Sequence, residues 1–194
     1  MNDKKTLSKW IDNYDIGKGG ALLILLVVSL LPFLILSFYN HPSPGDDYFE
    51  TDIALQKGFW EAQKWWYFNN SGRWFASMAI SLNPLVFHTY WAYKLNAAIL
   101  LALLLIAGYW LSGKLFSKLN ISARIGICSL FIFAYLIRLP IVGDGIFWLS
   151  GANSYLTAEI MSLFLLGCII SYTNSGNKKR YLILSCLLLI AIIS

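Results

Sequence analysis

The sequence predicts an all-α membrane protein, a polytopic bundle of transmembrane helices that forms one membrane domain over residues 1–194. Hydrophobic residues make up 58% of the chain, charged residues only 13%, and the mean hydropathy is +0.61, whereas soluble domains carry about 25% charge. A soluble fold of this length has too much surface for its volume to bury so many apolar side chains. The apolar residues also gather in long runs separated by basic, polar stretches, which is typical of successive membrane spans.

The first predicted span covers residues 19–39, a run without charge that is long enough for one helix across a hydrocarbon core of about 30 Å. Pro32 lies inside the run and is tolerated in membrane helices. A cleaved signal peptide fits less well, because the run is too long and no small-residue cleavage site precedes the turn at 40–42.

The first outer loop spans residues 40–84 and contains two predicted short helices. Apolar side chains between 52 and 66 recur at helical spacing: Leu55, Phe59, Ala62 and Trp66. Together with the surrounding aromatic residues, this spacing predicts an amphipathic helix that lies in the membrane interface. A second short helix, interfacial or partly inserted, is predicted over 74–82. It ends at Asn83 because the residue before Pro84 resists helical geometry.

Three further spans and an incomplete fifth are predicted at 85–111, 121–137, 154–172 and 181–194. The span at 121–137 is short, and it crosses the bilayer if Arg124 snorkels to the surface. A glycine-rich polar stretch at 138–153 forms the second outer loop. The last run has about 14 residues, about 21 Å of helix, which is shorter than a bilayer core. We therefore expect a fragment or truncated version of a longer protein, with a re-entrant or partner-completed helix as the alternative.

The basic residues predict the orientation, because cytoplasmic loops of membrane proteins are enriched in lysine and arginine. With the N-terminus inside, the inner segments hold ten basic residues: Lys4, Lys5, Lys9, Lys18, Lys114, Lys118, Arg124, Lys178, Lys179 and Arg180. The outer segments hold four: Lys57, Lys64, Arg73 and Arg138. We therefore predict a multi-pass protein of the bacterial inner (cell) membrane whose N-terminus is cytoplasmic and whose two polar loops face outward.

The net charge of +5 is explained by these topology signals, so no nucleic-acid partner is expected. The three cysteines lie within apolar runs, where cysteine behaves as a small hydrophobic residue. His41 and His88 are far apart and lack neighbouring ligands. Neither a cofactor nor a histidine or cysteine metal site is predicted.

The adjacent acids Asp46 and Asp47 follow directly on the outer end of the first span and are the candidate catalytic residues. Two neighbouring carboxylates in a cleft of low dielectric raise the pKa of one of them, and such a group can take a proton from an attacking hydroxyl. The pair can equally bind a divalent cation through its oxygens. From spacing alone, a turn or helix cap on a solvated loop is the simpler interpretation.

Three basic residues are candidate substrate-binding groups. Arg73 lies at the membrane surface, where a guanidinium suits bidentate phosphate binding or simply anchors the chain. Lys94 lies about 13 Å down the second span, a depth that requires snorkelling or a wet cavity. Arg138 begins the second outer loop.

Within that loop, Trp148, Asn153 and Tyr155 offer an aromatic platform with amide and hydroxyl groups, which suits a sugar. An aromatic belt at the membrane interface is the alternative interpretation.

Three motifs occur in order along the chain: Asp46-Asp47-Tyr48 after the first span, Asn70-Ser71-Gly72-Arg73 after the aromatic helix, and Phe147-Trp148-Leu149-Ser150-Gly151-Ala152-Asn153-Ser154-Tyr155. With this layout, the chain from about 19 to 172 resembles the N-terminal part of bacterial C-type membrane glycosyltransferases. The closer resemblance is to glucosyltransferase-like proteins that modify O-antigen or other surface polysaccharides. Members of that family are usually much longer and have about twice as many spans.

The resemblance implies transfer of a sugar from a polyprenyl-phosphate donor to a glycan acceptor at the outer leaflet. Asp47, supported by Asp46, matches the acid that serves as base or contacts the acceptor. Arg73 and Lys94 match basic groups that hold the lipid phosphate. Membrane lipid and a partner subunit, or a missing C-terminal half, are the further partners expected. The alternative is a non-enzymatic membrane subunit, such as a lipid-linked sugar flippase or a partner in polysaccharide assembly.

Overall fold

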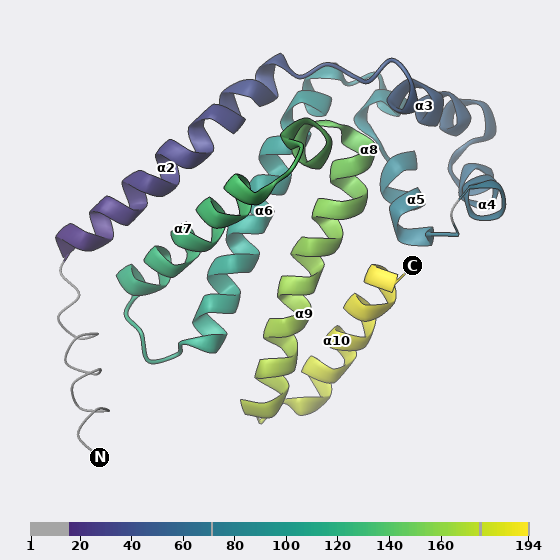
Figure 1. The fold of residues 1–194 in the computed structure, drawn as a ribbon. Coiled ribbons are helices and arrows are strands. Elements are labelled where there is room, and N and C mark those ends of the chain that lie inside the picture. Colours follow the sequence, from purple (N-terminus) through teal and green to yellow (C-terminus); the bar gives the residue numbers. More distant parts are fainter. Residues whose placement is uncertain (1–15, 71, 175, 194) are drawn as a thin grey trace, which may run out of the picture.

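The computed structural model describes residues 16–70, 72–174 and 176–193, which form helices and turns without a strand (Figure 1). Long helices form what we call the bundle: α2 (Ile16–Tyr39), α6 (Tyr90–Leu115), α7 (Ile121–Arg138), α9 (Thr157–Asn174) and α10 (Lys178–Ile193). Short helices at one end of the bundle form what we call the head: α3 (Asp46–Lys57), α4 (Phe59–Asn69), α5 (Trp74–Ser81), the 3₁₀ turn η1 (Pro84–Phe87), the π-helical turns η2 (Gly143–Phe147) and η3 (Ala152–Leu156), and α8 (Leu149–Gly151).

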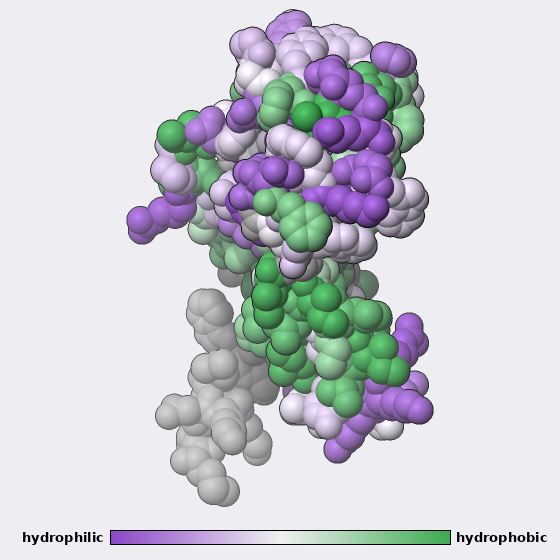
Figure 2. Space-filling view, turned by 90° about the vertical axis from the view of Figure 1, so that its right-hand side faces the viewer, coloured by the Kyte–Doolittle hydropathy of each residue, from purple (hydrophilic) through white to green (hydrophobic). Residues whose placement is uncertain are grey.

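The prediction of an all-α polytopic membrane protein is confirmed. Within the described part of the chain, four helical stretches are long and apolar enough to cross a membrane: Gly20–Tyr39, Tyr90–Leu115, Ile121–Arg138 and Leu149–Asn174. On the face seen in Figure 2, a hydrophobic band lies beneath a head in which hydrophilic and intermediate residues predominate. This division is expected when one part of a protein meets lipid and the other meets water.

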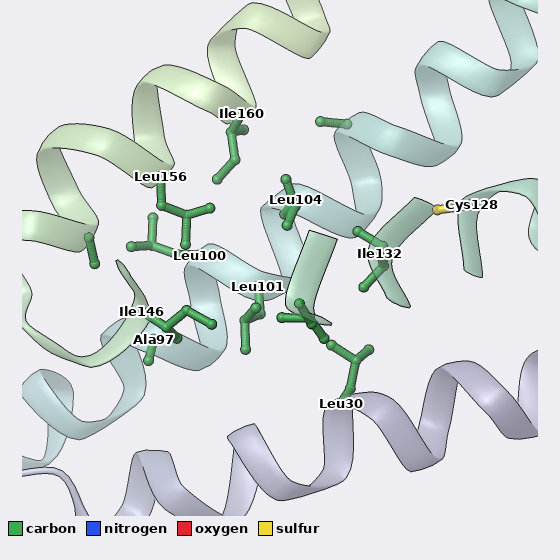
Figure 3. Packing of buried hydrophobic residues seen from close by; sticks show 13 residues of the cluster. Leu30, Ala97, Leu100, Leu101, Leu104, Cys128, Ile132, Ile146, Leu156 and Ile160 are labelled. Carbon is green, nitrogen blue, oxygen red and sulfur yellow. The ribbon is translucent and has the colours of Figure 1, made fainter. Parts of the chain in front are cut away.

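The core of the bundle lies where α2, α6, α7 and α9 meet (Figure 3). Leu104 of α6, Ile132 of α7 and Leu156 of η3 are at most 1% exposed. The outer side of α2 is different, because Ile24 and Val28 are more than 60% exposed. These helices therefore bury one apolar side in the core and leave another for lipid.

The single amphipathic helix predicted over 52–66 is wrong, because the chain forms two helices there. Gly58 separates α3 from α4 with a positive φ of 72°, a conformation that glycine adopts without steric cost. The break allows α4 to fold back on α3, so that Ala62 and Trp66 pack against Ile53 and Ala54. Half of the predicted apolar stripe is thus internal to the head.

The stretch 138–153, predicted as a polar loop, is mostly wound into helical turns, so the fourth apolar stretch begins at Leu149 rather than 154. The Trp148 N–H donates to the Gly143 carbonyl at 2.7 Å, and the Ala152 N–H donates to the Trp148 carbonyl at 2.8 Å. Gly151 permits this tight winding, because a Cβ there would lie 2.6 Å from the Asp144 carbonyl oxygen. Gly151 of this predicted loop thus allows close packing.

The other boundaries differ from the sequence prediction by smaller amounts. The break at Asn83-Pro84 is present, and the Asn83 side chain accepts from the Leu85 N–H at 2.6 Å. The second span begins at Tyr90 instead of 85, because η1 and the left-handed His88 (φ 54°) redirect the chain first. The helix predicted over 181–194 begins earlier, at Lys178, and α10 packs against α9.

Candidate functional site

A pocket of about 250 Å³ opens in the head, between α3, α5 and the turns around α8. Two carboxylic acids of α3, Asp46 and Glu50, line it together with the guanidinium-bearing Arg73. Trp148 and Tyr155 contribute aromatic side chains to the wall. The pocket therefore combines acids, one basic group and aromatic surface, although Asp46 and Trp148 are 102 positions apart in the sequence.

The acidic side chains of α3 lie on two different faces of the helix. Asp47 and Glu50 are three residues apart and lie on one helix face, which is turned toward the protein interior. Asp46 is exposed and belongs to the pocket wall, so the two adjacent acids have different surroundings.

Asp47 is fully buried, with 0% of its surface exposed, and lies beneath the pocket rather than in its wall. Its Oδ2 accepts from the Ser43 backbone N–H at 2.7 Å and from the Tyr93 hydroxyl at 2.9 Å. Its Oδ1 lies 3.4 Å from the Ser150 Oγ. Hydrogen-bond donors from three separate segments thus hold this carboxylate in place.

Glu50 is 7% exposed and reaches the pocket. Burial raises its pKa from the ordinary value of 4.5 to about 7. The hydrogen bond from the Ser150 hydroxyl opposes this rise, and the negative charges of Asp47 and Asp46 add to it. A carboxyl that titrates near neutral pH is able to accept and release a proton under physiological conditions.

Arg73 lies just before α5, at the border of the pocket. Its guanidinium carbon is 5.8 Å from the centre of the Tyr155 ring, within the range of a cation–π contact. Among the described residues, the one ion pair joins Lys64 and Glu61 on the surface of α4, so Arg73 has no carboxylate partner there. The guanidinium is therefore available to an anionic ligand.

The other sequence candidates lie around this pocket or away from it. Asn153 accepts a hydrogen bond from the Asn96 side chain at 3.1 Å and lines a neighbouring cavity of about 180 Å³. Lys94 points its Nζ toward the Tyr90 ring, 5.1 Å from its centre. Arg138 is exposed at the end of α7 and does not belong to the pocket wall. The pocket thus collects Asp46, Arg73, Trp148 and Tyr155.

Two residues of the site, Glu50 and Ser150, are not among the residues predicted from the sequence. The spacing of Glu50 is a signal that could have identified it, since an acid three residues after Asp47 lies on the same helical face. Ser150 lies within the motif at 147–155 but has no individual signal in the sequence, because only the folded chain brings it between Asp47 and Glu50.

Among the described residues, no group of three or more His, Cys, Asp or Glu side chains is arranged to hold a metal ion. The divergent directions of Asp46 and Asp47 explain why the two adjacent acids do not converge on one point. A divalent cation at this pair stays a prediction from the sequence.

No protein-family model matches the chain, and no similar protein was found among curated proteins or among solved structures.

Proposed function

We propose that this chain is a C-type membrane glycosyltransferase, or the N-terminal module of one, that passes a sugar from a polyprenyl-phosphate donor to a cell-surface glycan. One observation supports this proposal above all. A pocket in the head contains a carboxyl whose pKa burial raises to about 7, a guanidinium with no carboxylate partner among the described residues and two aromatic side chains. Its volume of about 250 Å³ is close to the lower end of ligand sites and suits one sugar ring better than a long oligosaccharide.

Each group has a role in this reaction. Glu50 is the base that takes the proton from the acceptor hydroxyl as that oxygen attacks the anomeric carbon. Arg73 binds the phosphate of the donor and stabilises the negative charge that develops on it as the bond to the sugar breaks. Trp148 and Tyr155 offer apolar faces to the sugar ring, and Asp46 accepts hydrogen bonds from its hydroxyls.

The role of Asp47 changes in this scheme. Asp47 is the preferred base on sequence grounds, but its complete burial keeps it from contact with an acceptor in the pocket. Glu50 reaches the same face of α3 one turn later and lines the pocket. We therefore assign the direct contact with the acceptor to Glu50.

The charge distribution supports a location of the pocket on the outer side of the bacterial inner membrane. Ten basic residues are assigned to inner segments and four to outer segments, and this bias is the main determinant of orientation in membrane proteins. A donor anchored in the outer leaflet then meets the head at the level of its phosphate.

A reconstituted reaction tests the proposal. The full chain in lipid nanodiscs is incubated with polyprenyl-phosphate glucose, galactose or mannose and a bacterial surface-glycan extract, and the release of polyprenyl phosphate is measured. We expect release with one of these donors and an at least 100-fold loss in Glu50→Gln, in line with general-base contributions of about 10²–10⁴. Lys64→Gln, on the exposed surface of α4, is the matched control and keeps full activity.

A wild-type chain that neither releases polyprenyl phosphate nor binds any of the polyprenyl-phosphate sugar donors overturns the proposal, because an N-terminal module alone would still bind the donor in this pocket. A non-enzymatic membrane subunit then becomes the better interpretation, and the acids of the head are expected to be dispensable for polysaccharide assembly in cells.

A further inference from the structure

The end of the bundle that lies away from the head carries a cluster of basic residues. The turn between α6 and α7 and the turn between α9 and α10 both lie there (Figure 1). Residues 112–125 and 173–181, which include these turns, contain no aspartate or glutamate. They contain six basic residues, which we call the basic end: Lys114, Lys118, Arg124, Lys178, Lys179 and Arg180. The formal charge of these segments is therefore entirely positive.

Lys114 connects two helices at this end. It lies in the last turn of α6, and its side chain is half-buried. Its Nζ is 5.4 Å from the centre of the Trp110 ring on α6 and 5.9 Å from the centre of the Tyr181 ring on α10. Because Tyr181 directly follows Arg180, Lys114 lies next to the basic first turn of α10. The positive charges of α6 and α10 thus belong to one region.

Arg124 adds a second half-buried cation from the start of α7. Its Nη2 donates to the Ser117 carbonyl at 2.8 Å. A Cβ on Gly113 would lie 3.5 Å from the Arg124 Nη1, so the guanidinium packs against the backbone beside Lys114. The Arg124 Nε is buried and has no hydrogen-bond partner among the described residues. The chain therefore does not use the full hydrogen-bonding capacity of this guanidinium.

No acid in the described part of the chain neutralises the basic end. The one ion pair among the described residues joins Lys64 to Glu61 in the head. Residues 1–15 contain three acids but also three lysines, so that segment brings no excess of negative charge. Like charges held together repel one another, and partial burial strengthens the repulsion because it excludes water. A bound anion removes this cost.

Exposed apolar side chains lie directly beside the cations. Leu115 of α6, Ile121 of α7 and Leu182 of α10 are 53%, 66% and 50% exposed. On the face seen in Figure 2, hydrophilic residues border the hydrophobic band at the end away from the head. The ligand that fits this surface carries a negative charge at one end and apolar chains at the other. That combination is the chemistry of an anionic phospholipid.

We propose that the basic end binds the phosphate headgroup of an anionic phospholipid, whose acyl chains lie along the exposed apolar side chains of α6, α7 and α10. Basic clusters beside or between transmembrane helices attract anionic headgroups in this way. The basic end is also the predicted cytoplasmic end, and the cytoplasmic leaflet carries a negative surface potential. A lipid held by Lys114 and by the start of α10 bridges two helices. It therefore stabilises α10, in which none of the described side chains is buried.

Lipid retention by the full chain in a neutral detergent tests the site, with native mass spectrometry as the readout. Phosphatidylglycerol and phosphatidylcholine with the same acyl chains are added in equal amounts. We expect the wild type to retain phosphatidylglycerol at least about 100-fold more strongly. Each basic residue near an anionic surface contributes about 1 kcal/mol, or about 5-fold. Lys114→Gln combined with Arg124→Gln is therefore expected to lower this preference about 25-fold.

Lys178→Gln combined with Lys179→Gln is expected to lower the preference by a similar factor. Both side chains are exposed, so this variant keeps the test valid if loss of the bond from Arg124 to Ser117 prevents folding. Lys57→Gln combined with Lys64→Gln is the matched control, because it removes two exposed positive charges from the head. The control should retain phosphatidylglycerol as the wild type does.

Glycerol phosphate distinguishes a lipid site from a site for free phosphate, because it carries the charge of the headgroup without acyl chains. A large excess should leave phosphatidylglycerol bound. Displacement by glycerol phosphate overturns the proposal. Equal retention of the two phospholipids by the wild type also overturns it, as does a loss in the head control as large as in the variants of the basic end.

Thermal denaturation in the presence of each phospholipid gives a second readout. Phosphatidylglycerol should raise the denaturation temperature of the wild type more than phosphatidylcholine does, because a ligand of the folded state stabilises it. The difference should vanish in Lys178→Gln combined with Lys179→Gln and should shrink as salt is added. Equal gains from the two lipids contradict the bridge between α6 and α10. Neither experiment measures glycosyl transfer, so lipid binding at the basic end and the proposed function of the head fail separately.

Discussion

The bundle and the head differ in what they bury. The core of the bundle contains mostly leucine, isoleucine, alanine and other apolar side chains from α2, α6, α7 and α9, joined by apolar side chains of the turns η2 and η3. The head buries polar groups at a much higher density: Asp47, Glu50, Thr51, Gln63, Ser77, Ser81, Asn83 and Ser150. A buried polar group costs free energy unless it is hydrogen-bonded, so such a concentration requires a specific reason.

Most of the buried polar groups of the head are hydrogen-bonded to one another, and this explains how they are tolerated; the Gln63 Oε1 is an exception, with no partner among the described residues. Thr51 donates to the Asp47 carbonyl at 2.6 Å and accepts from the Asn83 side chain at 2.9 Å. The Gln63 amide donates to the Ser77 carbonyl at 3.0 Å and to the Ser81 hydroxyl at 2.7 Å. These bonds join α3 to η1 and α4 to α5. The bundle gains stability from packing, whereas the head gains a fixed arrangement of polar groups around the pocket.

The largest effect is expected from Gly151→Ala in the head. A Cβ at this position would lie 2.6 Å from the Asp144 carbonyl oxygen and 2.5 Å from the Trp148 ring. Backbone cannot move aside cheaply, so we expect a loss of about 3 kcal/mol in stability, together with loss of any ligand binding in the pocket. Thermal denaturation in detergent measures the loss. Gly143→Ala is the control, because nothing lies within 4 Å of its added Cβ. Equal denaturation temperatures for the two variants would contradict the tight winding around α8.

A pH dependence of stability is expected from Glu50. Because its pKa is about 7 in the folded protein and 4.5 ordinarily, folding favours the neutral form. The stabilisation is complete below about pH 4.5 and is lost as the pH rises through 7. Its size is about 3 kcal/mol, since the pKa is about 7 instead of 4.5 and a difference of one in pKa corresponds to about 1.4 kcal/mol.

Denaturation curves of the wild type and Glu50→Gln between pH 5 and about 8.5 measure this contribution. The variant stays uncharged, so we expect the stability difference between the two proteins to shift in its favour as the pH rises. Asp52→Gln, at a surface position of α3, serves as the control. A difference that does not change with pH would mean that Glu50 titrates normally.

A smaller effect is expected from Gly167→Ala in the bundle. The new Cβ would lie 2.1 Å from the Trp110 ring, where α9 meets α6. This obstacle is a side chain that can turn, so we expect a loss of about 1 kcal/mol, at the low end of overpacking costs. The denaturation temperature should fall while the titration of Glu50 stays unchanged. Gly20→Ala, with open space around its Cβ, is the control. A larger loss than in Gly151→Ala would reverse the comparison between bundle and head.

The sequence predicts the bundle better than the head, for a physical reason. Apolar runs identify spans because a helix in lipid must satisfy its backbone internally and present apolar side chains. No such rule predicts the conformation around Gly151. Whether a glycine lies in an open loop or in a tight contact depends on its neighbours in the folded chain, here Asp144 and Trp148. For this reason the sequence does not predict the helical turns over 143–156.

The candidate site was predictable to the extent that its residues have local signals. Asp46 and Arg73 lie beside spans and carry charges at the membrane surface, and both line the pocket. The bond between Ser150 and Glu50 joins residues 100 positions apart, and neither residue alone indicates it. Asp46 and Asp47 also differ in burial. This difference is not visible in the sequence, because it results from the packing of Tyr93 and Ser43 around Asp47 in the folded chain.

The smallest effect is expected at the outer surface of the head. The Lys64 Nζ lies 2.6 Å from the Glu61 Oε1, but both side chains are more than 60% exposed. Water and salt screen such a pair, so we expect Lys64→Ala to change stability by less than about 0.5 kcal/mol. Denaturation at low and high ionic strength measures it. The change should shrink further as salt is added, because screening weakens only exposed charges. A loss comparable to that of Gly151→Ala would mean that α4 is held by its surface charges, and not by the packing of Ala62 and Trp66 against α3.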